Sequence, residues 1–321
     1  MSTSLTKITL MFRYGASFFL GTLLFPRALR QSVLTLYQFV RIPDQIVDGE
    51  VQSSSQKLNH LTRDDLQTHY TQAHVWLKAM LDERTRAYDD HDTVHTTRWE
   101  YVQLFDTYQI PLEYSQSFFQ AMLQDCTIHR YSTYAQLQGY MYGSASVVGL
   151  MMCSIVGYDI SQDSSVHGRA SHLGNAMQLT NFLRDIKEDY NYLDRIYIPT
   201  DILSTYGLSH DHIQQRSRGG YHHADPLLQQ SRKNCMQEMI SLCREWYHEW
   251  WLWLSYLHPT SRSAIQLASS LYAGILDRIE HVDYDVFSNN CRTTLWEKLS
   301  ITLRHLQSKK SDFIIWLKIF G

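Results

Sequence analysis

The chain has 321 residues, of which 44% are hydrophobic and 19% charged, and its formal net charge is −3. This length and balance are typical of a folded protein with one large core, and the lack of a basic surplus argues against a nucleic-acid partner. Only 14 glycines and 6 prolines occur, and because these residues mark the turns of loop-rich folds, their scarcity favours long helices.

Apolar residues recur at three- and four-residue steps in several segments, which is the spacing of one helix face. Taken in chain order, this pattern predicts helices over residues 29–47, 173–186 and 267–279. Pro111 is expected to start a further helix, and Pro199 to end the extended segment RIYIP.

The clearest loop is predicted over residues 216–226, where a Gly-Gly pair precedes a proline. The chain contains no internal repeat and no linker that would divide it. We therefore expect a single domain over residues 1–321, with a core over about 15–300 and a C-terminal tail over 301–321.

Five cysteines are present and none forms a CxxC pair, which favours free thiols in a reducing compartment and hence a cytoplasmic protein. The longest apolar run, residues 147–156, is too short to span a bilayer. The terminal segment FIIWLKIF, residues 313–320, follows Lys309 and Lys310. This segment could lie in a membrane interface, giving peripheral association with the inner face, or could form the last turn of a core helix. Both interpretations remain open.

Two aspartate pairs carry the clearest chemical signal. Asp44 and Asp48 lie four residues apart, and so do Asp185 and Asp189. On a helix, residues at this spacing share one face and like charges there repel each other. Each pair therefore needs either solvent or a cation, and one such pair alone is typical of a solvated surface.

Polar residues extend each pair into a stripe. Gln178 and Asn181 precede the second pair at helical spacing, in a segment whose other residues are largely apolar. A stripe of carboxylates and carboxamides on a largely buried helix requires compensation. Tyr37 and Arg41 precede the first pair in the same way.

Two such stripes facing each other would form a polar slot inside an apolar bundle. Their oxygen ligands suit Mg²⁺, which binds carboxylates together with phosphate oxygens and water. Arg41 and Arg184 suit a polyanion, because a guanidinium group matches the geometry of phosphate. The residues therefore predict a Mg²⁺-dependent diphosphate site, with Mn²⁺ as an alternative metal, at the mouth of an apolar cavity.

Longer motifs resemble those of a known family. In chain order they are SFFLGTLLFP, LYQFVRIPDQIVDGE, YMYGSASVVGLMM, GNAMQLTNFLRDIKEDY, RIYIP and LYAGILDRIEHVDYDVF. In order and spacing they resemble the squalene and phytoene synthase family over residues 17–299. The resemblance implies an all-α, single-domain helical bundle of the isoprenoid-synthase type around a central cavity. It also implies head-to-head joining of two allylic isoprenoid diphosphates.

The resemblance assigns roles to the residues that match the family's motifs. The implied metal ligands are Asp44, Asp48, Asn181, Asp185 and Asp189. The residues implied to contact the diphosphates or to order their ligands are Tyr37, Arg41, Gln178, Arg184, Arg195 and Tyr197. Tyr140 and Tyr272 are implied to face the reaction cavity. The positions implied along the prenyl-chain tunnel are Phe18, Ala145, Val148 and Gly149.

The YDVF motif near the C-terminus favours phytoene as the product, made from two geranylgeranyl diphosphates without NADPH. The alternative is a squalene or dehydrosqualene synthase that uses two farnesyl diphosphates. A non-catalytic relative that acts as an assembly factor is a third interpretation, and the presence of all four aspartates counts against it. The chain departs from the family at Pro43, directly before Asp44, where a proline is expected to kink the helix.

Overall fold

The computed structural model describes residues 15–48, 96–158, 166–219 and 225–308, together with parts of 67–78. In these ranges the chain forms helices and two isolated bridges, Arg130–Ile196 and Tyr158–Leu257, which confirms the predicted all-α class. The elements are α2 (Ala16–Thr22), α3 (Arg27–Val47), α5 (Thr96–Thr107), α6 (Leu112–Asp125), α7 (Tyr134–Met141), the π-helical turn η1 (Tyr142–Ser146), α8 (Val147–Val156), α9 (Val166–Leu193), α10 (Thr200–Thr205), α11 (His210–Ser217), α12 (Pro226–Trp253), the 3₁₀ turn η3 (Leu254–Tyr256), α13 (Pro259–His281) and α14 (Leu295–Ser308).

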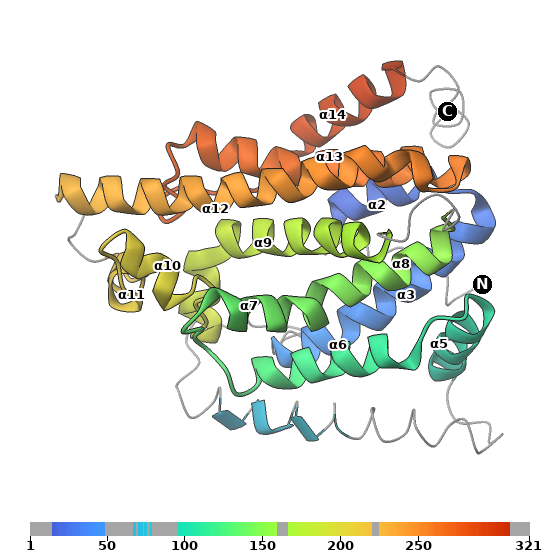
Figure 1. The fold of residues 1–321 in the computed structure, drawn as a ribbon, viewed down its shortest axis with the longest axis horizontal. Coiled ribbons are helices and arrows are strands. Elements are labelled where there is room, and N and C mark those ends of the chain that lie inside the picture. Colours follow the sequence, from blue (N-terminus) through green and yellow to red (C-terminus); the bar gives the residue numbers. More distant parts are fainter. Residues whose placement is uncertain are drawn as a thin grey trace.

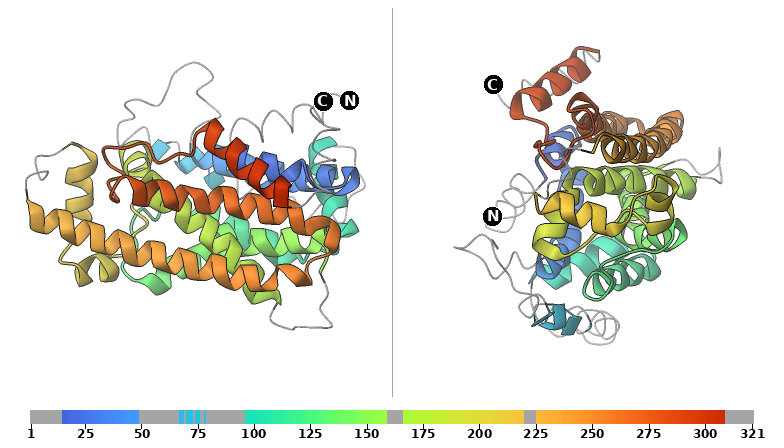
Figure 2. Two further views of the ribbon diagram at one scale, coloured as in Figure 1. Left: turned by 90° about the horizontal axis from the view of Figure 1, so that it is seen from above. Right: turned by 90° about the vertical axis from the view of Figure 1, so that its left-hand side faces the viewer.

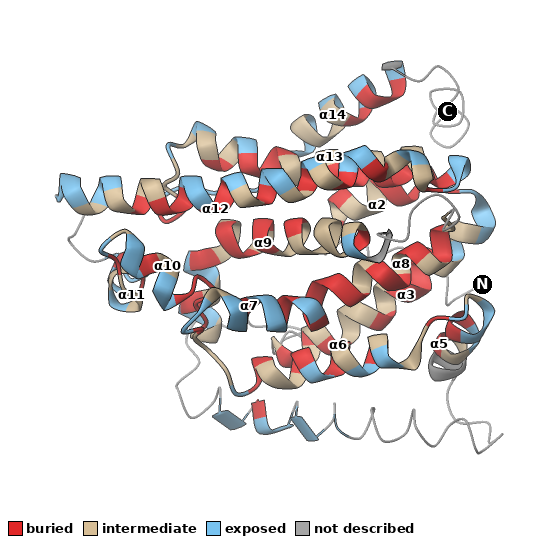
Figure 3. Cartoon of the chain, in the orientation of Figure 1, coloured by how far each residue is buried: buried red, intermediate tan, exposed pale blue. Residues whose placement is uncertain are grey.

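Helix α9 occupies the middle of the bundle. It packs against α8, η1, α11, α12 and α13, and Figure 1 shows it between a layer that contains α12 and α13 and a layer that contains α3 and α6–α8. The end-on view in Figure 2 shows the same stacking. No residue from 169 to 186 is exposed, as Figure 3 shows for most of this helix. The apolar pattern of residues 173–186 is therefore that of a helix covered by neighbouring helices.

Helix α3 confirms the prediction over residues 29–47 and passes through Pro43. Proline has no backbone N–H, so the carbonyl group of Phe39 lacks its usual helical donor. The helix nevertheless continues for another turn, and the amide of Asp48 donates to the carbonyl oxygen of Asp44 at 2.9 Å. Asp44 and Asp48 thus remain on one helical turn.

Tyr134–Val156 forms one continuous helix, made of α7, η1 and α8. The hydroxyl of Thr133 accepts a hydrogen bond from the amide of Gln136 and so caps its start. With 23 residues and a mean hydropathy of 1.4, this helix is long and apolar enough to cross a membrane, unlike the ten-residue run inferred from sequence. However, 61% of its most apolar window is buried within the fold, as in the core helix of a globular protein.

Helices α8 and α9 cross at very short range because both carry glycine. A Cβ atom at Gly149 would lie 2.5 Å from the carbonyl oxygen of Ala170, and one at Gly174 would overlap the carbonyl oxygen of Ala145. Small residues let two helix backbones approach this closely, so the two glycines set the distance between the layers.

The structure contains most of the helix boundaries that the sequence predicts. Pro111 and Pro199 directly precede α6 and α10, and α13 includes residues 267–279. The predicted loop over 216–226 is too long, because α11 extends to Ser217 and α12 begins at Pro226. Helix α14 continues past residue 300, and the tail segment 313–320 lies outside the described residues.

Candidate active site

The two aspartate pairs come from different helices and act on each other electrostatically. Asp44 and Asp48 lie at the C-terminal end of α3, and Asp185 and Asp189 lie on α9. Burial raises the pKa of Asp189 well above its usual value, and the charges of Asp185 and Asp48 raise it further. Burial likewise raises the pKa of Asp44 to about 6, with Arg41 opposing and Asp48 reinforcing the shift. The two aspartate pairs therefore lie close enough for the charge of Asp48 to act on Asp189, and the roles predicted for them stay predictions.

Arginine side chains partly neutralise these carboxylates. Arg41 donates from Nη1 to Oδ2 of Asp44, one turn along α3. Arg184 donates from Nε to Oδ1 of Asp185 at 2.7 Å and from Nη2 to Oδ2. Burial opposes the charge of Arg184, yet its hydrogen bond to Asp185 raises its pKa above the usual value. These guanidinium groups are charged and lie beside the carboxylates that a metal would use.

Arg195 connects the first aspartate pair to the segment that follows α9. Its side chain is 3% exposed, and Nη1 donates to Oδ1 of Asp48 at 2.9 Å. Nη2 donates to the backbone oxygen of Asp125 at 3.3 Å, and the guanidinium carbon lies 5.4 Å from the ring centroid of Tyr70. Its backbone amide donates to the carbonyl oxygen of Asp189 at 3.1 Å. Arg195 therefore contacts both aspartate-bearing segments, Asp48 through its guanidinium group and Asp189 through its backbone amide.

Tyr272 brings α13 to the same site. Burial raises the pKa of its hydroxyl, and the charges that act on it are those of Arg184, Arg41, Asp185 and Asp44. These four groups come from α3 and α9. The tyrosine implied by the C-terminal motif therefore lies where the two aspartate helices meet.

Tyr140 and Tyr197 lie in a buried aromatic cluster with Phe182 and Tyr131. The rings of Phe182 and Tyr197 stack at 3.8 Å with an interplanar angle of 11°, and Tyr140 stacks on Tyr197 at 5.7 Å. The hydroxyl of Tyr140 donates to Oδ2 of Asp125 at 2.8 Å, and that of Tyr197 to Oδ1 at 3.5 Å. The cluster is tied to Asp125 from two sides.

Asp125, Arg292 and Lys298 belong to this region but carry no sequence signal. Asp125 is a single acidic residue at the end of α6, outside any regular spacing. Arg292 places Nη2 3.9 Å from Oδ1 of Asp185. Burial lowers the pKa of Lys298, and the charges of Arg184 and Arg292 lower it further. Arg292, in the loop before α14, and Lys298, in the first turn of α14, therefore extend the cationic side of the site.

The remaining predicted contacts at the N-terminal side are half-buried. The ring of Phe18 stacks on that of Tyr37, with their centroids 6.0 Å apart. A Cβ atom at Gly15 would lie 2.7 Å from the Tyr37 hydroxyl oxygen, so glycine at this position makes room for that hydroxyl. Gln178 and Asn181 lie on α9, upstream of the second aspartate pair, and both are half-buried.

The predicted tunnel positions Ala145, Val148 and Gly149 lie where η1 and α8 meet α9. Gly149 and Ala145 are at the close backbone crossing, and Val148 beside them is half-buried. Their assignment to a prenyl-chain tunnel stays a prediction.

The carboxylate oxygens of the aspartates are of the kind that binds a divalent cation. Among the described residues, no group of three or more His, Cys, Asp or Glu side chains is already arranged to hold a metal ion. Arginines hold Asp44, Asp48 and Asp185 in this structure. Burial raises the pKa of Asp189, and the negative charges of Asp185 and Asp48 raise it further. A cation among these carboxylates would favour their charged forms.

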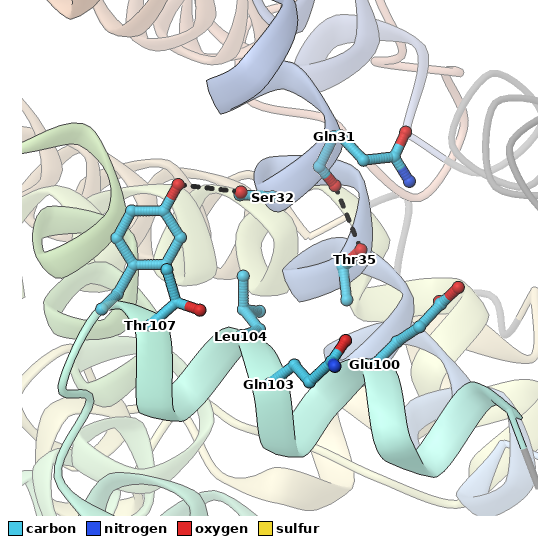
Figure 4. A pocket seen from close by; sticks show the side chains of 8 residues that line it. Gln31, Ser32, Thr35, Glu100, Gln103, Leu104 and Thr107 are labelled. Atoms are coloured by element: carbon cyan, nitrogen blue, oxygen red, sulfur yellow. Dashed lines mark hydrogen bonds between the residues drawn. The ribbon is translucent and has the colours of Figure 1, made fainter.

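A separate polar hollow of about 230 Å³ lies between α3 and α5. Figure 4 shows its lining, including the hydrogen bond between Ser32 and the Tyr108 hydroxyl at 2.9 Å. Its α3 residues end at Thr35, about 14 Å along the helix from Asp44 at a rise of ~1.5 Å per residue. The hollow is therefore distinct from the aspartate site.

Comparison with known proteins is consistent with this geometry. The profile of the squalene/phytoene synthase family matches residues 11–297. The chain is 30% identical to a phytoene synthase of Thermus thermophilus over 288 residues, covering 89% of this chain and 86% of that protein. It is 28% identical to 15-cis-phytoene synthase of Synechococcus elongatus over 299 residues, covering 89% and 87% of the two chains.

Solved structures share the fold. A dehydrosqualene synthase superposes with a TM-score of 0.73 at 20% identity, covering 96% of both chains. A squalene synthase of Alicyclobacillus acidocaldarius superposes with a TM-score of 0.67 at 22% identity, covering 87% of this chain and 93% of that one. Since the family profile and the curated relatives span most of the chain, this protein belongs to the squalene/phytoene synthase family.

Proposed function

We propose that this protein condenses two geranylgeranyl diphosphates head to head to give phytoene, through the cyclopropylcarbinyl intermediate prephytoene diphosphate, and releases two diphosphates. The observation that carries the proposal is that the aspartate pairs of α3 and α9 act on each other, with arginines beside each pair. The curated relatives named above are phytoene synthases, which favours this product.

The acidic residues proposed to hold Mg²⁺, or Mn²⁺, are Asp44, Asp48, Asp185 and Asp189, with Asn181 as a further ligand. When bound, the metal would supply positive charge for the diphosphate leaving groups. Arg41 and Arg184 lie beside the ligands and would bind diphosphate oxygens once released from their carboxylates. Gln178 and Arg195 would keep the ligands in order.

In the first step the C1–O bond of one substrate breaks, and diphosphate leaves with the electron pair. The double bond of the second substrate attacks the resulting allylic cation, and loss of a proton closes the cyclopropane ring. A second ionisation, rearrangement and proton loss give the 1-1′ linked hydrocarbon. The rings of Tyr140 and Tyr272 would stabilise the cations through their electron-rich faces, and the apolar surroundings would keep water away.

A squalene or dehydrosqualene synthase that uses two farnesyl diphosphates is the second candidate. The solved structures named above carry these activities in their titles, but at 20% and 22% identity they support the fold alone. Squalene formation consumes a hydride from NADPH, whereas phytoene formation ends in proton loss. We therefore expect no requirement for NADPH.

The test is a product assay with purified protein. With Mg²⁺ and geranylgeranyl diphosphate we expect phytoene and diphosphate, with no effect of NADPH. Removal of the metal with EDTA should abolish diphosphate release, because the carboxylates would repel the substrate, and added Mg²⁺ or Mn²⁺ should restore it. Turnover of farnesyl diphosphate alone would favour the second candidate. Failure of a folded protein to turn over either substrate would favour a non-catalytic relative.

We further propose that the protein is cytoplasmic and binds the inner face of the membrane peripherally through residues 313–320. This segment combines apolar residues with the neighbouring Lys309 and Lys310. In a flotation assay with anionic vesicles, the full chain should float with the lipid, and a variant that ends at Ser308 should not. Equal flotation of both would contradict a role for the tail.

A further inference from the structure

Asp125 is a buried acid that lies outside the aspartate pairs. It ends α6, its residue surface is 4% exposed, and it accepts hydrogen bonds from the hydroxyls of Tyr140 and Tyr197. Its backbone oxygen accepts from Arg195. Burying a carboxyl group is costly unless its oxygens are hydrogen-bonded, and here both oxygens have a phenol donor.

Asp125 interacts electrostatically with Asp44 and Asp48, the aspartate pair of α3. Burial raises the pKa of Asp125 to about 7, while the charge of Arg195 and the hydrogen bond from Tyr140 lower it; Asp48 and Asp44 raise it. Replacing only this acid by an apolar residue would leave the hydroxyls of Tyr140 and Tyr197 without their acceptor. Asp125 is therefore the common partner of both tyrosines.

The Tyr140 ring is held both by packing and by Asp125. Phe182 and Tyr197, whose rings stack on each other at 3.8 Å, pack against the Tyr140 ring at centroid distances of 6.2 and 5.7 Å. The Tyr140 hydroxyl donates to Asp125 at 2.8 Å. A ring that is packed on one side and fixed through its hydroxyl keeps one orientation. The Tyr140 proton is also committed to a carboxylate, so the phenol cannot donate it to an intermediate.

We propose that Asp125 is a positioning residue. It fixes the orientation of the Tyr140 ring and, through Arg195, fixes the position of that ring relative to Asp48. Arg195 bridges the two acids, with Nη1 on the Asp48 carboxylate and Nη2 on the Asp125 backbone oxygen. The catalytic meaning of this link rests on the proposed function, in which Tyr140 faces the cations and Asp48 holds the metal.

A double-mutant cycle tests the link. Asp125→Asn keeps one acceptor but loses the charge, and it should lower kcat by roughly 10- to 100-fold while KM changes by less than about threefold. In a Tyr140→Phe background the same substitution should lower kcat by less than about threefold, because the hydroxyl that Asp125 holds is already absent. Asp125→Leu should be slower than Asp125→Asn even if it is equally stable.

Thermal unfolding supplies a readout that needs no substrate. Asp125→Asn should lower Tm by on the order of 5 °C, and by clearly less in the Tyr140→Phe background. The control is Asp106→Asn, a change of the same kind at an exposed position on α5. It should leave kcat unchanged and should lower Tm by clearly less than Asp125→Asn does.

The two readouts separate this inference from the proposed function. If the wild type turned over neither substrate, the proposed function would fail, while the thermal cycle would still decide whether Asp125 holds Tyr140. Multiplicative losses of kcat in the double variant, or additive shifts in Tm, would overturn the positioning role. So would full activity of Asp125→Leu.

Discussion

Asp185→Ala is expected to reduce diphosphate release by roughly a thousand-fold, which corresponds to ~4 kcal/mol of transition-state stabilisation. Asp185 belongs to the pair on α9, and its carboxylate contributes to the field that raises the pKa of Asp189. Its removal would take away one oxygen ligand and leave Arg184 without its bidentate partner. Release of diphosphate from labelled substrate under single-turnover conditions measures the effect.

Two companion variants make this result specific. Asp185→Asn keeps the shape and most of the fold, so it should lose nearly as much activity with little change in Tm. Asp277→Ala removes an acid from α13 whose side chain is 70% exposed, and it should retain full activity. Diphosphate release that is unchanged in Asp185→Ala would refute the metal-binding role of this residue.

Gly174→Ala is expected to destabilise the fold by about 3 kcal/mol, because the added methyl group would overlap the carbonyl oxygen of Ala145 across the helix crossing. The neighbouring contact is backbone, so it cannot move aside as a flexible side chain would. For a chain of this size Tm should fall by roughly 4 to 5 °C. Differential scanning calorimetry of the purified variant measures the shift.

The same helix offers a matched control. Gly168 also lies on α9, but a Cβ atom there would have no heavy atom within 4 Å. Gly168→Ala should therefore be neutral or slightly stabilising, since alanine favours helix more than glycine does. Equal Tm values for the two variants would show that the α8–α9 crossing tolerates a wider spacing than the structure has.

Helix periodicity made α3 and α9 predictable, because each has an apolar face that the bundle covers. The two aspartate pairs were predictable for a related reason: residues four apart on a helix must share a face. The continuous helix over Tyr134–Val156 was not, because its glycines and serines interrupt the apolar pattern at η1. There the small residues serve a close helix crossing rather than a turn.

Contacts between distant segments could not be read from spacing. Arg195 reaches Asp48 across 147 residues of sequence, and only the folded bundle brings them together. Asp125 and Arg292 likewise follow from how α6 and the loop before α14 are placed. Local patterns therefore predict the elements and the chemistry of a site, while the partners of its charged groups depend on packing.

Because of the π-helical turn Tyr142–Ser146, the number of residues in the helix over Tyr134–Val156 cannot change without consequence. A π turn is wider than an α turn and accommodates one extra residue. The turn therefore absorbs that residue and keeps α8, with Gly149, in phase with Tyr140. Inserting or deleting a residue elsewhere along this helix, where no wide turn absorbs the change, would rotate one half by about 100° against the other. A side chain would then face the carbonyl oxygen of Ala170 in place of Gly149.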